Sequence, residues 1–309
     1  MQTLIPAIDR ELLQSELTRE HFVRRTNNGH NEIYIFDASS APHLMQEVGR
    51  LRELSFREAG GGTGEPTDID RYDTMSLPFR QLIVWHPRDR QIVGGYRYIL
   101  CSDLEFVNGA PQSPTSRLFR LSDRFVSDFM PHTIELGRSF VQPAYQPAVN
   151  IRKGMYSLDN LWDGLGALVI NHPHIRYFFG KVTMYPHFNP RARDLILYFM
   201  KMYFPDPDAL VEPYEPLELV TPTDELKKVF TGGGYEADYK LLVHNVRSLG
   251  EGIPPLVNAY MNLSPSMRSF GTSINNHFGG VEETGILVTI GDIYDIKKDR
   301  HVNTYHKEE

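Results

Sequence analysis

One apolar segment that carries two opposite charges constrains this chain more than any other feature. Residues 132–141 read His-Thr-Ile-Glu-Leu-Gly-Arg-Ser-Phe-Val, a strand pattern that contains Glu135 and Arg138. A charge inside such a run costs several kcal/mol unless it is paired or used in a site. Residues three apart on an ideal strand point to opposite faces, so the two can share a cleft only across an interruption, predicted at Gly137. The segment is therefore a reaction centre or a structural ion pair at a strand end.

The composition is that of a soluble globular protein with one elaborated domain or two. Of its 309 residues, 41% are hydrophobic and 23% charged, unlike a disordered or fibrous chain. A net charge of −7 argues against nucleic acid as the main partner. The start of the chain does not read as a signal peptide, and the apolar run 195–204 is short and holds Lys201. The cytoplasm is the expected compartment.

Alternation and helical spacing predict a mixture of strands and helices. We expect strands at 32–36, 80–85, 91–100, 177–185 and 285–290, and helices at 42–56, 157–170, 190–203, 236–249 and 254–263. Ser157 is the predicted N-cap of its helix, and residues 142–154 form the loop before it. Core packing best explains the aromatic and methionine-rich stretch 198–204, with a lipid tunnel or membrane contact as the alternative.

Three further features argue against a bound nucleotide or metal. The glycine cluster at 59–64 lacks the Lys-Ser/Thr of a P-loop and does not follow a strand, so a flexible loop is expected. The acidic segment at 68–73 supplies too few ligands for a metal and is expected to be solvated. The single cysteine, Cys101, excludes an intramolecular disulfide and a multi-cysteine metal site.

The order of these parts resembles one branch of a known enzyme superfamily. A helix with Arg52 and Phe56 precedes an Asp-x-Asp-x-x-Asp loop, a strand ending in Val-Gly-Gly-Tyr-Arg97, and Glu-Leu-Gly-Arg-Ser at 135–139. This pattern is similar to the acyl-carrier-protein-dependent branch of the GNAT superfamily. That branch holds the ornithine-lipid and glycine-lipid N-acyltransferases, their hemolysin-named relatives and the acyl-homoserine lactone synthases.

The resemblance covers roughly residues 45–200 and implies an α/β (α+β) fold of GNAT type. We expect a mixed, mostly antiparallel central sheet flanked by helices, with a helical insertion. A single acyltransferase domain would occupy residues 1–296. Its core would comprise 30–200 and 251–292, with a helical and proline-rich insertion at 205–250 and a charged tail at 297–309.

The resemblance also implies which residues form the site. Glu135, Arg138 and Arg97 take the catalytic positions, and the substrate-binding positions fall on Arg52, Phe56, Asp68, Asp70, Asp73, Ser139 and Tyr185. Amide formation from a thioester needs a neutral amine, so Glu135 would accept the amine proton. Arg97 and Arg138 would offer a bidentate fork to an amino-acid carboxylate, although Arg97 could also be an edge arginine with a solvated head. Tyr185 would return a proton to the thiolate, or it is a core or rim tyrosine.

The donor implied by the resemblance is the acyl-phosphopantetheine of acyl carrier protein, with no permanently bound cofactor. The place of a coenzyme A pyrophosphate loop reads Gln-Pro-Ala-Tyr-Gln at 142–146, so a coenzyme A thioester is the less expected donor. The carrier-binding positions are Arg152, Lys153 and Ser157, because two cations and a helix N-terminus would suit the arm's phosphate and an acidic carrier. The alternative is that the two cations are solvated surface charges.

The leading hypothesis is an N-acyltransferase of aminolipid biosynthesis. It would move a long acyl or 3-hydroxyacyl chain from acyl carrier protein to the α-amine of a small amino acid such as ornithine or glycine. Peripheral contact with the inner membrane is compatible with that role. The alternatives are a synthase of acyl-homoserine-lactone-type signals or N-acyl amino acids, and a non-enzymatic lipid-binding or hemolysin-like protein. The His-x-x-x-x-Asp motif of glycerophosphate-type O-acyltransferases is absent from the sequence.

Overall fold

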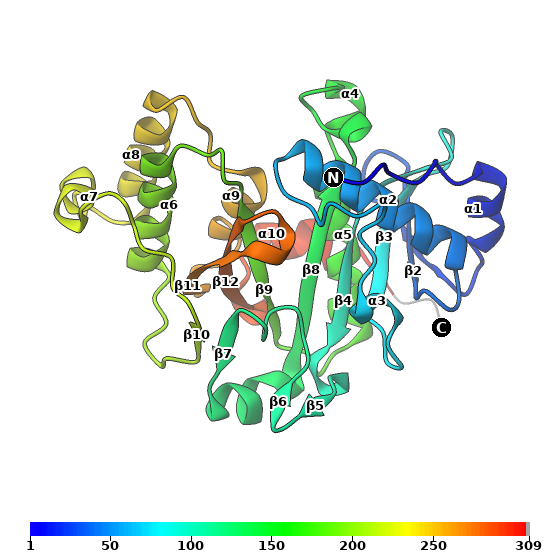
Figure 1. The fold of residues 1–309 in the computed structure, drawn as a ribbon, viewed down its shortest axis with the longest axis horizontal. Coiled ribbons are helices and arrows are strands. Elements are labelled where there is room, and N and C mark those ends of the chain that lie inside the picture. The colour runs from blue at the N-terminus through cyan, green and yellow to red at the C-terminus, as the bar shows by residue number, and fades with distance from the viewer. Residues whose placement is uncertain (307–309) are drawn as a thin grey trace.

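One mixed sheet organises the computed structural model, which describes residues 1–306 (Figure 1). Within that range, eight strands form the sheet in the order β1-β2-β3-β4-β8-β9-β12-β11, and every neighbouring pair except β8 and β9 is antiparallel. These strands are β1 (Phe22–Arg25), β2 (Glu32–Phe36), β3 (Arg80–His86), β4 (Gln91–Leu100), β8 (Thr133–Val141), β9 (Tyr177–Met184), β11 (Arg268–Asn275) and β12 (Val281–Thr289). The expected mixed, mostly antiparallel sheet is confirmed.

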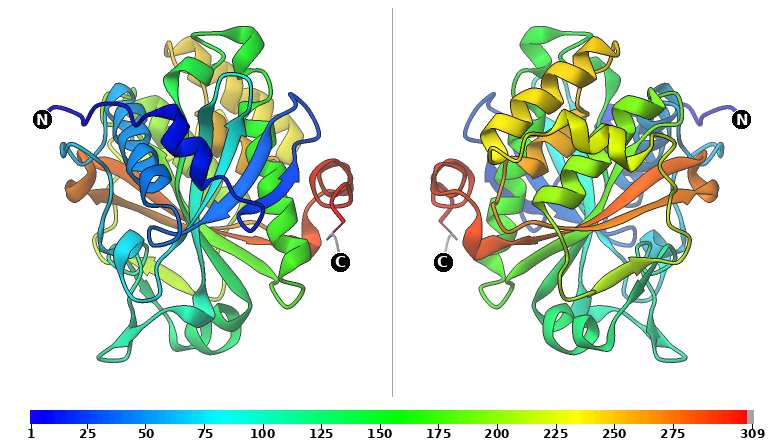
Figure 2. Two further views of the ribbon diagram at one scale, coloured as in Figure 1. Left: turned by 90° about the vertical axis from the view of Figure 1, so that its right-hand side faces the viewer. Right: turned by 90° about the vertical axis from the view of Figure 1, so that its left-hand side faces the viewer.

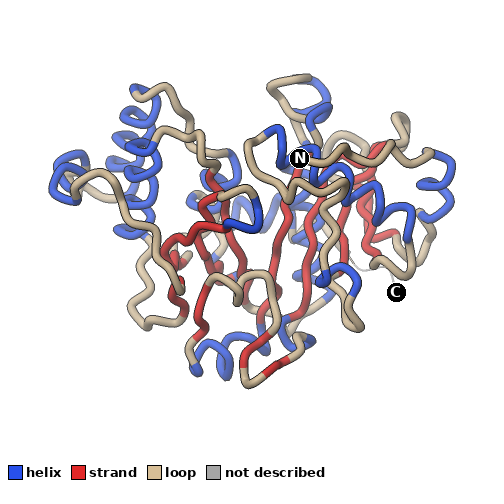
Figure 3. The backbone as a smooth tube through the Cα atoms, viewed as in Figure 1, coloured by secondary structure: helices blue, strands red, loops and turns tan. Residues whose placement is uncertain are grey.

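Two small ribbons and a set of helices surround the sheet (Figure 3). The ribbons pair β5 (Phe106–Val107) with β6 (Ala110–Pro111), and β7 (Phe119–Leu121) with β10 (Val211–Pro213). The helices are α1 (Arg10–Glu16), α2 (Pro42–Glu58), α3 (Arg71–Thr74), α4 (Ile151–Gly154), α5 (Ser157–Asn171), α6 (Pro190–Tyr203), α7 (Thr223–Val229), α8 (Tyr235–Ser248), α9 (Pro255–Met261) and α10 (Asp295–His301). No helix in residues 1–306 has the length and apolarity needed to cross a membrane.

The sheet has helices on both faces (Figure 2) and a core on each face, because side chains alternate along its strands. On β3, Leu82 and Val84 face a core that includes Leu161 of α5, whereas the intervening Ile83 faces a core that includes Val48 of α2. All five side chains are almost fully buried, and each such burial contributes about 1.5–3 kcal/mol. The helices α5 and α2 are thereby held on opposite faces of the central strands.

The aromatic stretch at 198–204 is core, as expected. Phe199 and Met200 of α6 are 0% and 1% exposed. The Phe199 ring lies 4.7 Å from that of Tyr203 and 5.4 Å from that of Tyr235 on α8. The tilted contact between Phe199 and Tyr235 holds α6 and α8 together at the end of the molecule where Figure 1 also shows α7.

The chain after residue 297 differs from the expected charged tail. Residues up to His301 belong to α10, which packs on α5, and residues 307–309 lie outside the described part. The His301 Nδ1 atom lies 2.7 Å from an oxygen of Asp163, and both side chains are buried. A histidine and a carboxylate can be buried when they pair in this way. The charged composition of this segment did not predict that part of it is buried.

The sequence analysis missed β1 and β11, the two edge strands, and placed the start of β12 four residues late. Edge strands carry polar residues outward and show a weak alternation. The part of β12 that was not predicted contains Glu282 and Glu283, and the sequence pattern alone does not favour two adjacent charges in a buried strand. Arg193 lies 2.6 Å from Glu282 and Lys181 lies 2.8 Å from Glu283, so both carboxylates are compensated by charge.

Candidate active site

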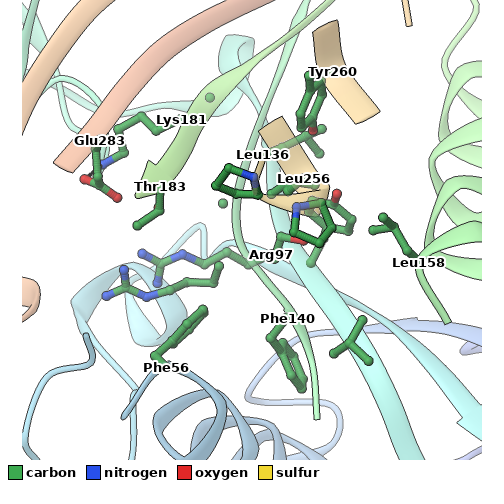
Figure 4. Close-up of a pocket in the computed structure, with 18 of the residues that line it drawn as sticks. Phe56, Arg97, Leu136, Phe140, Leu158, Lys181, Thr183, Leu256, Tyr260 and Glu283 are labelled. Carbon is green, nitrogen blue, oxygen red and sulfur yellow. Dashed lines mark ion pairs between the residues drawn. The ribbon is translucent and has the colours of Figure 1, made fainter. Parts of the chain in front are cut away.

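The principal cavity opens where two parallel strands separate. The pairing of β8 with β9 ends at Leu136 and Gly180, although both strands continue beyond that point. A cleft of about 590 Å³ lies in this opening and is lined by residues of β4, β8, β9, β12 and α9. Figure 4 shows Arg97, Lys181, Thr183, Glu283 and Phe56 toward one side of the cleft, and leucines and Tyr260 toward the other. The cleft therefore has a charged half and an apolar half.

A bulge in β8 brings the two opposite charges to one face of the sheet. Gly95 of β4 pairs with Phe140 and Arg97 pairs with Gly137, so three steps on β8 face two steps on β4. Arg138 takes a left-handed backbone with φ 50°, which is unusual for a side chain larger than glycine's. The interruption predicted at Gly137 is present, but the extra residue lies at Arg138 and Ser139.

Glu135 is buried and is not paired with Arg138. Glu135 is only 2% exposed, and its Oε1 atom accepts a hydrogen bond from the Thr115 N–H at 3.1 Å. Burial raises the Glu135 pKa, while hydrogen bonds from Thr115 and Ser113 and the charge of Lys181 oppose the shift. A Glu135–Arg138 structural ion pair is therefore the wrong interpretation of this strand.

The acidic loop is a buried counter-charge and not a solvated loop. Arg52 of α2 lies 3.2 Å from Asp73, and Arg97 lies 3.1 Å from Asp73 and 2.9 Å from Asp70. Arg52 and Asp73 are 0% exposed and Arg97 is 1% exposed. Arg97 lines the cleft, but Asp70 and Asp73 already occupy its guanidinium, so its edge-arginine interpretation is wrong.

The Asp70 and Asp73 carboxylates also shape the loop itself. Asp70 accepts from the Tyr72 N–H and Asp73 accepts from the Asp70 N–H, which together form a capping box for α3. Although burial acts to raise the pKa of both carboxylates, their arginine partners outweigh it and lower the Asp70 pKa to about 2. The folded protein thus favours the charged forms of Asp70 and Asp73, whereas burial raises the pKa of Asp68 despite its arginine neighbours.

Among the three arginines of this network, Arg138 has the side chain that is most exposed to the cleft. Its Nε atom lies 2.7 Å from Asp68, its Nη2 atom lies 3.8 Å from Asp70, and its guanidinium covers the Phe278 ring at 3.8 Å. Phe278 in turn meets the Phe56 ring edge-on at 5.0 Å. The Arg138 side chain is 14% exposed and lines the cleft, so part of its fork remains available to a ligand.

Lys181 and Glu283 form a second charged pair in the cleft that the sequence analysis did not identify. Lys181 of β9 lies 2.8 Å from Glu283 of β12 and donates to the Pro114 carbonyl at 3.1 Å. Burial raises the Glu283 pKa, but Lys181 and the Asn275 amide outweigh it and lower that pKa overall. A lysine inside the apolar strand pattern at 177–184 was the available sequence signal.

Tyr185 lies at the end of β9 with its ring against a packed glycine loop. Burial and the Glu283 carboxylate raise the Tyr185 pKa to about 12, so its hydroxyl keeps its proton. A Cβ on Gly61 would lie 3.1 Å from the Tyr185 ring and 2.8 Å from Val281. The buried Glu53 accepts hydrogen bonds from the N–H groups of residues 63 and 64, so the expected flexible loop is anchored.

The apolar half of the cleft faces α5 and α9. Ser139, Tyr96 and Tyr260 contribute hydroxyls there, and Leu136, Leu158 and Leu256 supply much of the remaining surface (Figure 4). The backbone of Val141 also faces this opening. The N–H of the next residue donates to β4, and N–H groups along an antiparallel strand alternate in direction, so the Val141 N–H points away from β4 and into the cleft. The Val141 carbonyl points the same way and accepts from Gln146.

The residues expected to receive the donor arm lie beside this half but differ from the prediction in detail. Arg152 is exposed on α4, which Figure 1 shows projecting from the body of the molecule. Lys153 is already 2.5 Å from Asp89. Ser157 does not cap α5, because it is the first helical residue and its Oγ atom donates to the Tyr145 carbonyl at 2.9 Å. The N-cap prediction was wrong.

Comparison with known proteins adds three findings. Residues 51–153 match the acetyltransferase (GNAT) domain. The chain is 53% identical to a glycine N(alpha)-acyltransferase of Bacteroides thetaiotaomicron, over 99% of this chain and 91% of that protein. It is 48% identical to a glycine N(alpha)-acyltransferase of Phocaeicola vulgatus, over 100% and 95%. A coenzyme A-dependent acyl-homoserine lactone synthase, solved with SAM and isopentyl-CoA, gives a TM-score of 0.35 at 12% identity, with 87% of this chain and 89% of that chain covered.

Proposed function

We propose that this chain, which belongs to the same family as these two glycine N(alpha)-acyltransferases, transfers a long acyl chain from acyl carrier protein to the α-amine of glycine. The observation that carries the proposal is the single cleft with a buried carboxylate and an arginine in one half and an apolar lining in the other. An acyl transfer needs both halves, because its acceptor is a small charged amino acid and its donor carries a long apolar chain.

The charged half suits the acceptor. Arg138 would bind the glycine carboxylate with the part of its fork that Asp68 leaves open. Glu135 would accept a proton from the glycine ammonium, directly or through water, and so release the neutral amine as nucleophile. The raised Glu135 pKa brings the carboxylate closer to the amine in basicity, which favours this transfer.

The amine would then attack the thioester carbonyl and form a carbon–nitrogen bond. The negative charge that develops on the carbonyl oxygen would meet the Val141 N–H, a donor fixed in the opening between the strands. Collapse of that intermediate breaks the carbon–sulfur bond and expels a thiolate. Tyr185, protonated because its pKa is raised to about 12, would give its proton to the sulfur and take up the second proton that the nitrogen loses as the amide forms, while Glu135 releases the first proton to water.

Two features favour acyl carrier protein over coenzyme A as donor. Gln142 and Gln146 use their side-chain amides to bind backbone carbonyls, which closes the segment where a pyrophosphate loop would lie. Arg152 remains free of ion pairs with the described residues and lies on α4, whose Gly154 lines the cleft. An exposed cation without an ion pair on a projecting helix suits an acidic carrier protein.

The test is an acceptor and donor panel. Purified protein is incubated with hexadecanoyl and 3-hydroxyhexadecanoyl thioesters of acyl carrier protein or coenzyme A, together with glycine, alanine, serine or ornithine. Mass spectrometry then measures the N-acyl products. We expect N-acylglycine to dominate and the carrier thioesters to react faster. Equal turnover of both donors would refute the donor assignment, and a preference for ornithine would refute the acceptor assignment.

A further inference from the structure

We infer that the hydroxyls of Tyr96, Ser139 and Tyr260 form a polar subsite that hydrogen-bonds an oxygen of the acyl donor close to its thioester. The inference rests on the proposed function for the direction in which the donor enters. The subsite lies in the apolar half of the cleft, on the face of β4 opposite Arg97. It would therefore act on the donor and not on the amino acid.

The subsite is built from buried side chains of three different elements. Tyr96 comes from β4, Ser139 from the bulge of β8 and Tyr260 from α9, and all three line the cleft. Tyr96 is 3% exposed and Tyr260 is 5% exposed. The Tyr260 ring is held edge-on by Trp162 of α5, with centroids 5.4 Å apart. The hydroxyls are therefore fixed in place before any ligand enters.

The Tyr96 hydroxyl is the observation that calls for a ligand. It lies beside Ser139 and Tyr260, yet the Tyr96 Oη atom is buried and makes no hydrogen bond of good geometry within residues 1–306. Leaving a buried hydroxyl unsatisfied costs about 1–3 kcal/mol. A phenylalanine at this position would avoid that cost and fill the same space, so the hydroxyl is a liability unless it contacts something in the cleft.

The chemistry of the phenols indicates what they contact. Burial raises the pKa of Tyr96 and of Tyr260, so both hydroxyls are protonated and can donate. A ligand that offers an acceptor oxygen would therefore satisfy them. Two parts of an acyl-phosphopantetheine thioester provide one: the amide carbonyls of the arm, and an oxygen substituent on the acyl chain near the carbonyl carbon.

The chain offers a close control for testing the subsite. Tyr98 lies two residues further along β4, faces the same core and is also 3% exposed, but it does not line the cleft. Tyr96→Phe and Tyr98→Phe therefore remove the same atom from the same strand at the same burial. Ser139→Ala provides a second variant on the subsite.

The first measurement uses calorimetry to determine how tightly the protein binds a non-reactive thioether analogue of hexadecanoyl-pantetheine and the 3-hydroxy form of that analogue. We expect Tyr96→Phe to weaken at least one analogue by about 10-fold, as for one lost hydrogen bond, with Tyr98→Phe unchanged. A loss confined to the 3-hydroxy analogue assigns the contact to the acyl chain. A loss with both analogues assigns it to the arm. Equal binding by wild type, Tyr96→Phe and Tyr98→Phe would refute the subsite.

The second measurement separates the subsite from the proposed function. In turnover assays, Tyr96→Phe should change kcat/KM for the donor and leave the KM for glycine unchanged. A raised glycine KM would place Tyr96 on the acceptor side and overturn the inference. If the wild-type protein binds the analogues but produces no N-acylglycine, the proposed function fails while the subsite stands.

Discussion

The two halves of the cleft share strands β4 and β8, but they differ in whether their polar groups are paired before a ligand binds. In the charged half, Arg52 and Arg97 pair with Asp73 and Asp70 before any substrate arrives. In the apolar half, the Tyr96 hydroxyl makes no hydrogen bond of good geometry with the described residues and α4 exposes Ile151. The difference indicates a preorganised acceptor side and a donor side that is completed by its ligand. Preorganised dipoles cost no reorganisation during reaction, whereas a long chain needs space that can adapt.

The comparison is tested most severely by breaking the buried charge network. Arg52→Met should lower the free energy of unfolding by about 3–5 kcal/mol, because it leaves Asp73 partly uncompensated in the interior. Urea denaturation followed by circular dichroism measures this. Arg120→Met breaks an exposed pair with Glu212 and should cost about 1 kcal/mol or less. Similar costs for the two variants would mean that the network is not the support of the charged half.

Removing the proposed base should affect chemistry and not stability. Glu135→Gln keeps an acceptor for the Thr115 N–H but cannot take a proton, so kcat should fall about 100-fold or more. Its melting temperature should not fall below the wild-type value, because a neutral amide replaces a buried carboxylate. A well-folded variant with wild-type kcat would remove Glu135 from the mechanism.

The same residue sets a pH dependence. Since burial raises the Glu135 pKa and only the carboxylate accepts a proton, wild-type kcat/KM should rise with pH through that pKa. A raised folded-state pKa also means that Glu135 contributes stability at low pH and loses it as pH rises through that value. Glu135→Gln should therefore gain stability relative to wild type on the alkaline side, and a rate profile without that rise would contradict the assignment.

A smaller effect is expected at Arg138. Arg138→Lys keeps the charge but loses the fork, so the KM for glycine should rise about 10-fold while the donor KM stays constant. Initial rates with each substrate varied in turn measure both constants. A raised donor KM would show that the charged half also binds the donor.

The smallest effect should come from the entrance to the apolar half. Arg152→Glu should raise the KM for the carrier thioester by a few-fold at low salt and less at high salt, where charges are screened. Arg19→Glu, a change of the same charge elsewhere on the surface, is the control. An effect that is insensitive to salt would argue against electrostatic docking.

The sequence was sufficient where local pattern determines structure. The strands at 32–36, 80–85 and 91–100 and the helix from Pro42 were predicted because their alternation or helical spacing is strong, and the structure extends the second strand by one residue. The GNAT-type fold and the interruption between Glu135 and Arg138 were also predictable. The partner of each charge was not, because the contact of Arg138 with Asp68 spans 70 residues of chain and depends on a left-handed backbone angle.

Lys181 and Glu283 show the same limit more sharply. Each looks unfavourable in its own strand, and each becomes acceptable only when β9 and β12 pair. The local propensity of a strand carries no information about an ion pair between two residues that are about 100 positions apart in the sequence. The late strand was therefore begun four residues too far along, after the glutamates.

The position of β12 in the sheet has a consequence for biosynthesis. β12 pairs with β9 along its whole length and, with the turn before it, supplies Glu283, Ile286 and Phe278 to the cleft. A nascent chain that lacks residues 281–289 therefore presents β9 as an unpaired, largely apolar edge and has no closed cleft. Translation must therefore reach β12 before the site can assemble, and a chain that stalls before this strand exposes an edge that favours association. A stop codon just before Val281 would abolish the wall of the cleft together with the edge of the sheet.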